Sequence, residues 1–266
     1  MKRLVKVVCF CAASLFFLTA ASLLRGMCFI FSFPPNSIMT NTARVWAKVM
    51  NAIMDISVMV EGENKPSEQH AALIVSNHLS YLDIVIIASV LPTLFVAKKE
   101  VRHWPMLGWL ARLGGTIFVD RSLFRGGIAA ATEIVRTLQS NVRVHIFPEG
   151  TSSSGERVLP FKPSLFAAAL EAHVPIQPVT IQYFKINGEP FSDGNRDTVC
   201  WYGNMKFVEH FFRFLNCKKI SASVTIHPLI IPSPYSTPQS LAIQSHATVV
   251  SAHRTKSATL LQEEVV

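Results

Sequence analysis

His78 and Asp83 are the pair of side chains in this sequence best spaced for acid–base chemistry. They lie five residues apart, and His78 follows the apolar run Ala71–Ser76 almost directly, which predicts a strand. His78 would therefore stand at the carboxyl end of a strand, where α/β folds bind ligands. A turn would let Asp83 hold one ring nitrogen while the other accepts a proton. Spacing alone leaves open a core histidine beside a helix-capping aspartate.

A second polar cluster follows the predicted strand Arg143–Phe147. It places a carboxylate, a glycine and hydroxyl side chains in one turn, which can bind a polar headgroup through backbone amides. A solvated loop is the structural alternative. Nucleotide binding by a P-loop is not expected, because Glu156 and Arg157 replace its Lys and Ser/Thr, and the sequence has no GxSxG elbow. The residues of the cluster are Glu149, Gly150, Thr151, Ser152 and Ser153.

Four basic residues lie close to these two motifs in the sequence. Arginine offers a two-pronged donor to a phosphate, and lysine offers a point charge. The group could converge on a phosphate, although scattered cations are more often ordinary surface residues. The four candidates are Lys98, Lys99, Arg121 and Lys162.

Alternating apolar and helical segments predict the elements that position these residues. From residue 55 onward the alternation predicts an α/β fold with a mixed central sheet flanked by helices. Expected strands are 56–60, 71–76, 94–97, 116–119, 143–147, 175–183 and 221–227. Expected helices are 83–91, 104–113, 122–140 and 163–172, with a last helix that Thr237 caps and Pro238 begins.

The N-terminal region predicts a membrane-anchoring helical segment. Val7–Leu24 holds 18 residues without a charge, and a helix of this length spans about 27 Å. A cleaved signal peptide is the alternative, but the apolar run continues past the candidate cleavage site. We therefore expect a retained anchor over residues 1–35.

The orientation of this anchor depends on its flanking charges. Lys2, Arg3 and Lys6 favour a cytoplasmic N-terminus, and a complete span would then place the remaining chain outside. A re-entrant or interfacial arrangement would keep it on the cytoplasmic side. An amphipathic helix is expected over 36–54, where Arg44 and Lys48 lie four residues apart; it could lie on an anionic membrane or pack on the next domain. The domain itself would cover 55–231, followed by a C-terminal helix and tail over 232–266.

Composition agrees with a membrane partner. Of 266 residues, 50% are hydrophobic and 16% are charged, with a net charge of +8; soluble domains average about 25% charged residues. Six of the basic residues lie in residues 1–60 beside one acidic residue, so the excess charge adjoins the most apolar part of the chain. This excludes intrinsic disorder and argues against nucleic-acid binding. Five cysteines without a CxxC motif predict no metal site and no disulfide framework.

Taken together, four sequence blocks resemble the glycerolipid acyltransferase family, specifically the 1-acyl-glycerol-3-phosphate acyltransferases. They occur in the order found in that family and cover about residues 36–231. The blocks are Asn77-His78-Leu79-Ser80-Tyr81-Leu82-Asp83, which fits NHxxxxD; Lys98-Lys99-Glu100 with Pro105, Gly108, Gly115 and Phe118-Val119-Asp120-Arg121; Phe147-Pro148-Glu149-Gly150-Thr151; and Val174-Pro175-Ile176-Gln177-Pro178-Val179.

The resemblance implies that His78 is the general base and Asp83 its partner. It also implies that Arg121, Glu149 and Gly150 help to bind the acyl acceptor, a role expected for Thr151 and Ser152 as well. The acceptor would be a lysolipid, and the donor a thioester of coenzyme A or of acyl carrier protein. These are co-substrates, so no cofactor is expected. The resemblance therefore implies a membrane enzyme whose catalytic domain lies on the cytoplasmic face.

One departure from the family pattern concerns the acceptor. Many lysophosphatidate enzymes have an arginine after Glu-Gly-Thr, whereas this chain has Ser152. The following residues, including Trp201-Tyr202-Gly203, look more like the branch that includes lyso-ornithine lipid acyltransferases. The expected reaction forms phosphatidate from 1-acyl-glycerol-3-phosphate. Alternatives are acylation of lyso-ornithine lipid or another lyso-aminolipid, and a membrane-associated hydrolase or thioesterase that uses the same His78 and Asp83.

Overall fold

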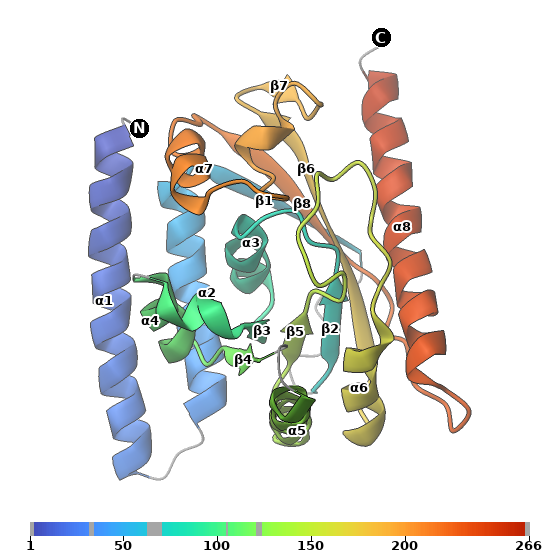
Figure 1. Ribbon diagram of the computed structural model, residues 1–266. Helices are drawn as coiled ribbons and strands as arrows, with labels where there is room; N and C mark the ends of the chain where they lie inside the picture. Colours follow the sequence, from blue (N-terminus) through green and yellow to red (C-terminus); the bar gives the residue numbers. More distant parts are fainter. Residues whose placement is uncertain (1–2, 32–34, 63–70, 105, 121–123, 264–266) are drawn as a thin grey trace.

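A mixed eight-stranded sheet forms the centre of the molecule (Figure 1). The computed structural model describes residues 3–31, 35–62, 71–104, 106–120 and 124–263. The strand order is β1-β8-β6-β2-β5-β3-β4, and β7 pairs with β6. The sheet is parallel except where β6 meets β7 and β8, which confirms the expected α/β class. The strands are β1 Ile56–Gly62, β2 Leu73–Ser76, β3 Leu94–Lys98, β4 Ile117–Val119, β5 Val144–Ile146, β6 Ile176–Ile186, β7 Glu189–Pro190 and β8 Ile220–Ile226.

Helices cover both faces of this sheet and extend beyond it on one side (Figure 1). One face packs on α2, α3 and α7, and the other packs on α5, α6 and α8. The α-helices are α1 Arg3–Ile30, α2 Pro35–Ile53, α3 Leu82–Val90, α4 Leu107–Leu113, α5 Phe124–Gln139, α6 Ala167–Glu171, α7 Phe207–Phe214 and α8 Pro238–Glu263. Short 3-10 turns occupy Lys99–His103, Pro163–Phe166 and Arg196–Thr198.

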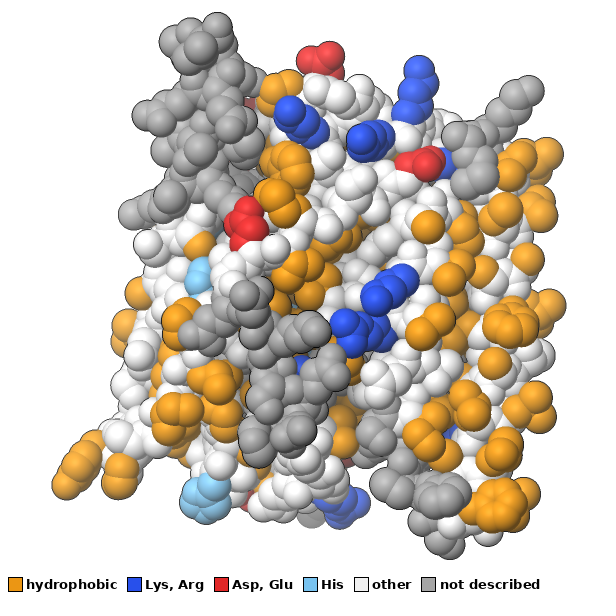
Figure 2. Space-filling view, turned by 180° about the vertical axis from the view of Figure 1, so that it is seen from behind, with side chains coloured by type: hydrophobic (Ala, Val, Ile, Leu, Met, Phe, Trp, Pro, Cys, Tyr) orange, Lys and Arg blue, Asp and Glu red, His pale blue; other side chains and the backbone are white. Residues whose placement is uncertain are grey.

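The first two helices, α1 and α2, form a hairpin on the face of the sheet that also carries α3 and α7. Phe17 and Ala21 of α1 are buried against Met39 of α2 and Leu110 of α4. The opposite side of α1 remains apolar and exposed, and Figure 2 shows such side chains along this edge of the molecule. Of the described helices, α1 is long and apolar enough to cross a membrane. Its 28 residues give a length of about 42 Å.

Lys6 joins α1 to the domain rather than facing solvent. Its side chain is 1% exposed, and its Nζ lies 3.0 Å from Asp55 Oδ2. The same ammonium donates to the carbonyl of Cys217 at 2.6 Å and to that of Met54 at 3.4 Å. Lys6 is one of the three flanking charges expected to orient an anchor. Its burial shows a structural role instead.

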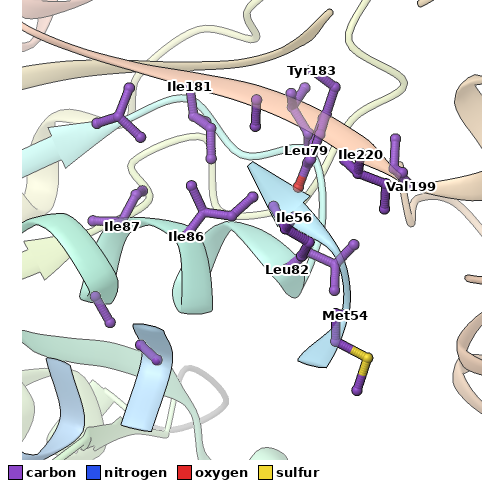
Figure 3. Close-up of a cluster of buried hydrophobic side chains, with 14 of the residues drawn as sticks. Met54, Ile56, Leu79, Leu82, Ile86, Ile87, Ile181, Tyr183, Val199 and Ile220 are labelled. Carbon is purple, nitrogen blue, oxygen red and sulfur yellow. The ribbon is translucent and has the colours of Figure 1, made fainter. Parts of the chain in front are cut away.

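Alternation along the strands separates two buried clusters. In β2, Ile74 faces the α2–α3 side, whereas Leu73 and Val75 face the α5–α8 side, as the two-residue period of a strand requires. Figure 3 shows the first cluster, in which Ile86 and Ile87 of α3 pack beneath the sheet. Helix α3 packs between the sheet and α2. The residues just before α3 are therefore held in place at the end of β2.

Two helical segments differ from the sequence expectation. The expected helix 104–113 begins only at Leu107, because Trp104 precedes a proline and adopts an extended backbone that ends the preceding 3-10 turn. Helix α7 was not predicted, although Phe207, Phe211 and Phe214 recur at helical spacing. The expected strands and the remaining helices are confirmed, with ends that shift by a few residues.

Candidate active site

His78 and Asp83 meet at the junction of β2 and α3. His78 Nδ1 lies 2.9 Å from Asp83 Oδ2. Asp83 is fully buried, while the His78 side chain is 17% exposed. The turn between them is closed by the backbone N–H groups of Leu79 and Ser80, which donate to the same Oδ2 at 2.6 and 2.8 Å. The contact expected from the five-residue spacing is therefore present.

The arrangement fixes which nitrogen of His78 is basic. An ionised carboxylate only accepts hydrogen bonds, so Nδ1 carries the proton that points to Asp83. The remaining nitrogen, Nε2, keeps its lone pair. His78 lines the main cavity, so the geometry of a general base with an orienting carboxylate is in place.

Tyr183 completes the surroundings of Asp83 from a distant part of the chain. Its hydroxyl donates to Asp83 Oδ1 at 2.7 Å, and its side chain is 3% exposed. Figure 3 shows Tyr183 in the buried cluster with Leu79 and Leu82. Burial is the largest cause that raises the pKa of the Tyr183 hydroxyl well above its usual range, and the charge of Asp83 adds to it. Tyr183 therefore stays protonated and acts as a donor.

Asn77 anchors the same turn to the sheet. Its side-chain amide donates to the carbonyl of Ile181 at 2.9 Å, and its side-chain oxygen accepts from the Ile181 N–H at 2.9 Å. This pairing imitates a strand contact and extends the β2–β6 ladder by one residue. Neither Asn77 nor Tyr183 was assigned a role from the sequence. Asn77 belongs to the NHxxxxD motif, but Tyr183 lies 100 residues from its partner without a local signal.

Glu149 supports His78 through the backbone. Its Oε1 accepts from the His78 N–H at 2.9 Å, and the side chain is 2% exposed. Burial raises the pKa of Glu149 to about 8, against the lowering effect of hydrogen bonds from the His78 and Leu159 backbone. Its Oε2 has no hydrogen-bond partner among the described residues. The acceptor-binding role implied for Glu149 stays a prediction; the contact seen here positions His78.

An aromatic stack supports the face of the His78 ring. Phe147 stacks on it with ring centroids 3.8 Å apart, and the His145 ring lies 4.6 Å from the Phe147 ring in a tilted arrangement. His145 is fully buried, and burial lowers its pKa to about 3, so this second histidine is neutral. Its Nε2 lies 2.9 Å from Ser76 Oγ. The stack restricts rotation of the catalytic imidazole.

The loop after Phe147 closes over the same turn. Gly150 has a φ of 77°, a conformation that favours glycine, and Ser153 N donates to the His78 carbonyl at 2.9 Å. Ser152 Oγ donates to the carbonyl of Trp201. Gly150, Thr151 and Ser152 all line the cavity beside His78. The structure thus brings these three predicted residues to the site.

The three predicted cations that the structure describes do not converge. Lys98 lines the cavity, whereas the ammonium of Lys99 lies 3.0 Å from Asp120 in an ion pair. Lys162 is exposed and does not line this cavity. Arg121 lies outside the described residues. Lys98 is therefore the predicted cation that the described structure places beside the motif residues.

The cavity runs from His78 into an apolar interior of about 660 Å³. Residues from the N-terminal hairpin and from α7 contribute to its walls together with residues of α3, β3 and α4, so elements far apart in the sequence enclose one space. Tyr81, which also lines it, has its hydroxyl 2.9 Å from His210 Nδ1. Wall residues include Phe10, Phe17, Trp46, Met50, Phe95, Phe207, Phe211 and Phe214.

The chain is similar in sequence to known acyltransferases. The family model described as Acyltransferase matches residues 57–182. The chain is 36% identical over 179 residues to a lyso-ornithine lipid O-acyltransferase of Rhizobium meliloti, which covers 65% of this chain and 61% of that protein. It is 35% identical over 211 residues to the Rhodobacter capsulatus protein of the same name, which covers 77% and 73%.

Two further matches carry a different name. A 1-acyl-sn-glycerol-3-phosphate acyltransferase of Neisseria gonorrhoeae is 32% identical over 173 residues, 65% of each chain. The crystal structure of the 1-acyl-sn-glycerophosphate acyltransferase PlsC from Thermotoga maritima covers 95% of this chain and 98% of its own, with a TM-score of 0.64 and 23% identity. That structure shares the fold. Its motifs, its fold and its similarity to these relatives together show that the chain belongs to the acyltransferase family.

Proposed function

We propose that the protein is a membrane-bound O-acyltransferase that moves a fatty acyl group from a thioester donor to the hydroxyl of a lysolipid. The observation that carries this proposal is the oriented imidazole of His78 at the wall of a large apolar cavity. A base at this position has access to a substrate hydroxyl, and the apolar interior suits an acyl chain.

The chemistry needs one base and no covalent enzyme intermediate. His78 Nε2 takes the proton of the acceptor hydroxyl while its oxygen attacks the thioester carbonyl. The tetrahedral intermediate then collapses to the ester, the carbon–sulfur bond breaks, and the thiolate takes up the proton from His78. Asp83 stabilises the transient imidazolium through its bond to Nδ1.

The first acceptor that we propose is 1-acyl-glycerol-3-phosphate, which would give phosphatidate. The four sequence blocks support it, as do the names of the Neisseria and Thermotoga proteins. Coenzyme A and acyl carrier protein remain the two candidate thiols of the donor.

A zwitterionic lyso-aminolipid, such as lyso-ornithine lipid, is the second candidate acceptor. Lys98 and Glu100, which carry opposite charges, both line the cavity, and they would suit a headgroup with a carboxylate and an ammonium. Ser152 supplies no cation there. Two of the relatives above carry the matching name.

An assay on purified membranes separates these candidates. Acyl-CoA and acyl carrier protein donors are each combined with lysophosphatidate and with lyso-ornithine lipid, and the diacyl products are quantified. The rate of diacyl product formation with one acceptor should exceed the rate with the other by at least about tenfold, as expected when the site pairs the charges of one headgroup and not those of the other. Free fatty acid as the main product with either acceptor present would instead indicate a thioesterase.

We also propose that the N-terminal hairpin lies along the membrane, with the catalytic domain on the cytoplasmic face. Residues from Lys6 to Cys28 are buried along one side of α1, so the domain covers this helix over most of its length. A helix that crossed the bilayer alone would leave that side in lipid. Protease accessibility of the domain in sealed, inside-out vesicles tests the orientation, and full protection would contradict it.

A further inference from the structure

A second cavity lies outside the active site, between α2, β1 and the end of α3. Its volume is about 500 Å³, within the usual range for ligand pockets of roughly 300–1,000 Å³. Of the described lining residues, it shares Ile56 with the His78 cavity. Helix α2 separates the two spaces, with Trp46 and Met50 on the catalytic side.

The polar lining of this cavity is basic. Arg44 and Lys48 lie one turn apart on α2, and Arg143, which is 7% exposed, joins them from the start of β5. No Asp or Glu is found among its lining residues in the described part of the chain. Basic side chains at one cavity are the groups that proteins use to bind a phosphate.

Asn51 adds a polar group in the same row of α2. It follows Lys48 by one turn, lines the cavity and is 6% exposed. Its side-chain oxygen has no hydrogen-bond partner within the described residues, and such a buried acceptor is costly. A ligand hydroxyl would satisfy it. Arg44 Nε also approaches the Ser89 carbonyl at 3.5 Å, so Arg44 partly serves the end of α3.

The surroundings indicate a lipid rather than a soluble anion. The walls include Val58, Val60 and Leu91. The next residues along α2 from the two cations, Val45 and Val49, are 63% and 42% exposed. In Figure 2, Lys and Arg side chains lie beside the apolar side chains of the α1 edge. The cavity therefore opens where the apolar surface of the hairpin ends.

We infer that this cavity binds the headgroup of an anionic phospholipid that is not the substrate. Lys48 and Arg143 hold the phosphate, Arg44 supports them, and Asn51 accepts a headgroup hydroxyl. The lipid chains lie on the exposed apolar side of α1 and α2. The inference rests on the proposed membrane attachment, but it concerns a site on the far side of α2 from His78.

Lipid binding by the full-length protein in mild detergent tests this site. Phosphatidylglycerol and phosphatidylcholine are titrated separately, and bound lipid is measured by native mass spectrometry. The pocket variant is Lys48→Gln with Arg44→Gln. The matched control is Lys218→Gln with Lys219→Gln, which removes two exposed charges elsewhere. If the double variant unfolds, the single variant Lys48→Gln replaces it as the pocket variant, because Lys48 is exposed.

Wild-type protein should bind phosphatidylglycerol at least about tenfold more tightly than phosphatidylcholine. The pocket variant should lose about thirtyfold of that affinity, since each of its two removed cations contributes about 1 kcal/mol to anionic lipid binding, and the control should keep it. Equal losses in both variants, or no preference in the wild type, would overturn the inference. Thermal stabilisation by inorganic phosphate equal to that by phosphatidylglycerol would also overturn it, in favour of a free-anion site.

Acyl transfer in the same samples keeps the two proposals apart. The pocket variant should retain turnover in phosphatidylcholine micelles, because its changes lie outside the His78 cavity. Absence of turnover in the wild type, together with selective phosphatidylglycerol binding, would remove the proposed function and leave the lipid site standing.

Discussion

At the scale of residues, the chemistry depends on how completely Asp83 is held. Its two oxygens accept from His78 Nδ1, Tyr183 Oη and the backbone N–H groups of Leu79 and Ser80. A buried carboxylate with these donors has one orientation, and so does the imidazole bound to it. The sequence predicted the His78–Asp83 contact, because it is local. It could not predict Tyr183, which only the folded sheet brings near.

Tyr183→Phe should slow acyl transfer without changing lysolipid affinity. The carboxylate loses one donor and attracts the protonated His78 more strongly, so the acidic limb of the pH–rate profile should move to higher pH. We expect kcat to fall about tenfold while KM stays constant, because Asp83 loses a contact that fixes its orientation and that of His78, and a hydrogen bond to a charged group contributes about 1.5–3 kcal/mol. Tyr202→Phe removes a Tyr–Asp bond of the same 2.7 Å length from Asp197 and should leave the pH profile in place. An unchanged pH profile in Tyr183→Phe would assign this residue to packing alone.

Glu149 gives the fold a pH dependence of defined sign. Its carboxyl ionises near pH 8 in the folded chain and near its ordinary value of 4.5 when unfolded. Between these values the folded state binds more protons, so the free energy of unfolding falls as pH rises. Glu149→Gln keeps an acceptor for the His78 N–H and should remove this fall, which thermal unfolding from pH 5 to 8 measures.

The exposed residue Glu171 supplies the control for that experiment. Glu171→Gln should retain the wild-type decline in melting temperature across the same pH range. If Glu149→Gln declines as steeply as the wild type, Glu149 does not ionise within this range in the folded protein.

At the scale of elements, the N-terminal hairpin packs on the rest of the domain and contributes to its cavity. Lys6 ties α1 to Asp55 and to the Cys217 carbonyl, and Phe10 and Phe17 line the catalytic cavity. The sequence predicted an apolar helix here from its length, but hydropathy cannot show which side packs on protein. Helix α7 was not predicted because it has only eight residues. The helical spacing of its phenylalanines repeats too few times in so short a segment to indicate a helix.

Lys6→Met should loosen α1 from the domain. The change leaves the Cys217 carbonyl without this donor and Asp55 without its cation, which should reduce stability by about 2 kcal/mol, because Asp55 is partly exposed. A lower melting temperature and faster cleavage within residues 3–31 by added protease would show it. Lys219→Met at an exposed site is the control; the same stability in both variants would mean that the Lys6 contacts contribute little.

At the scale of the whole molecule, the fold assembles one apolar space from distant segments. Its walls include residues of α1, α2 and α7, and His78 lies at the end of β2. The mixed sheet and most of its strands were predictable from alternation and turn residues. The cavity was not, because it depends on how the hairpin packs across α3 and α4.

Ala43→Phe should change the acyl chains that the enzyme accepts. Ala43 lines the cavity and packs beside the Phe17 cluster, so a larger side chain reduces the space for a long chain. The ratio of kcat/KM for 16-carbon over 10-carbon donors should fall at least about tenfold, since each buried methylene contributes about 0.8 kcal/mol. An unchanged ratio would show that the acyl chain lies elsewhere.

If His78 is the base for acyl transfer, His78→Ala removes the proton acceptor and leaves the fold intact. The measurement is diacyl lipid formation from the better donor and acceptor, beside thermal unfolding and an exposed-histidine control, His103→Ala. We expect a melting temperature within a few degrees of the wild type and a rate lower by about 10²–10⁴-fold, with full activity in the control. A folded His78→Ala protein that turns over at a substantial fraction of the wild-type rate would contradict it.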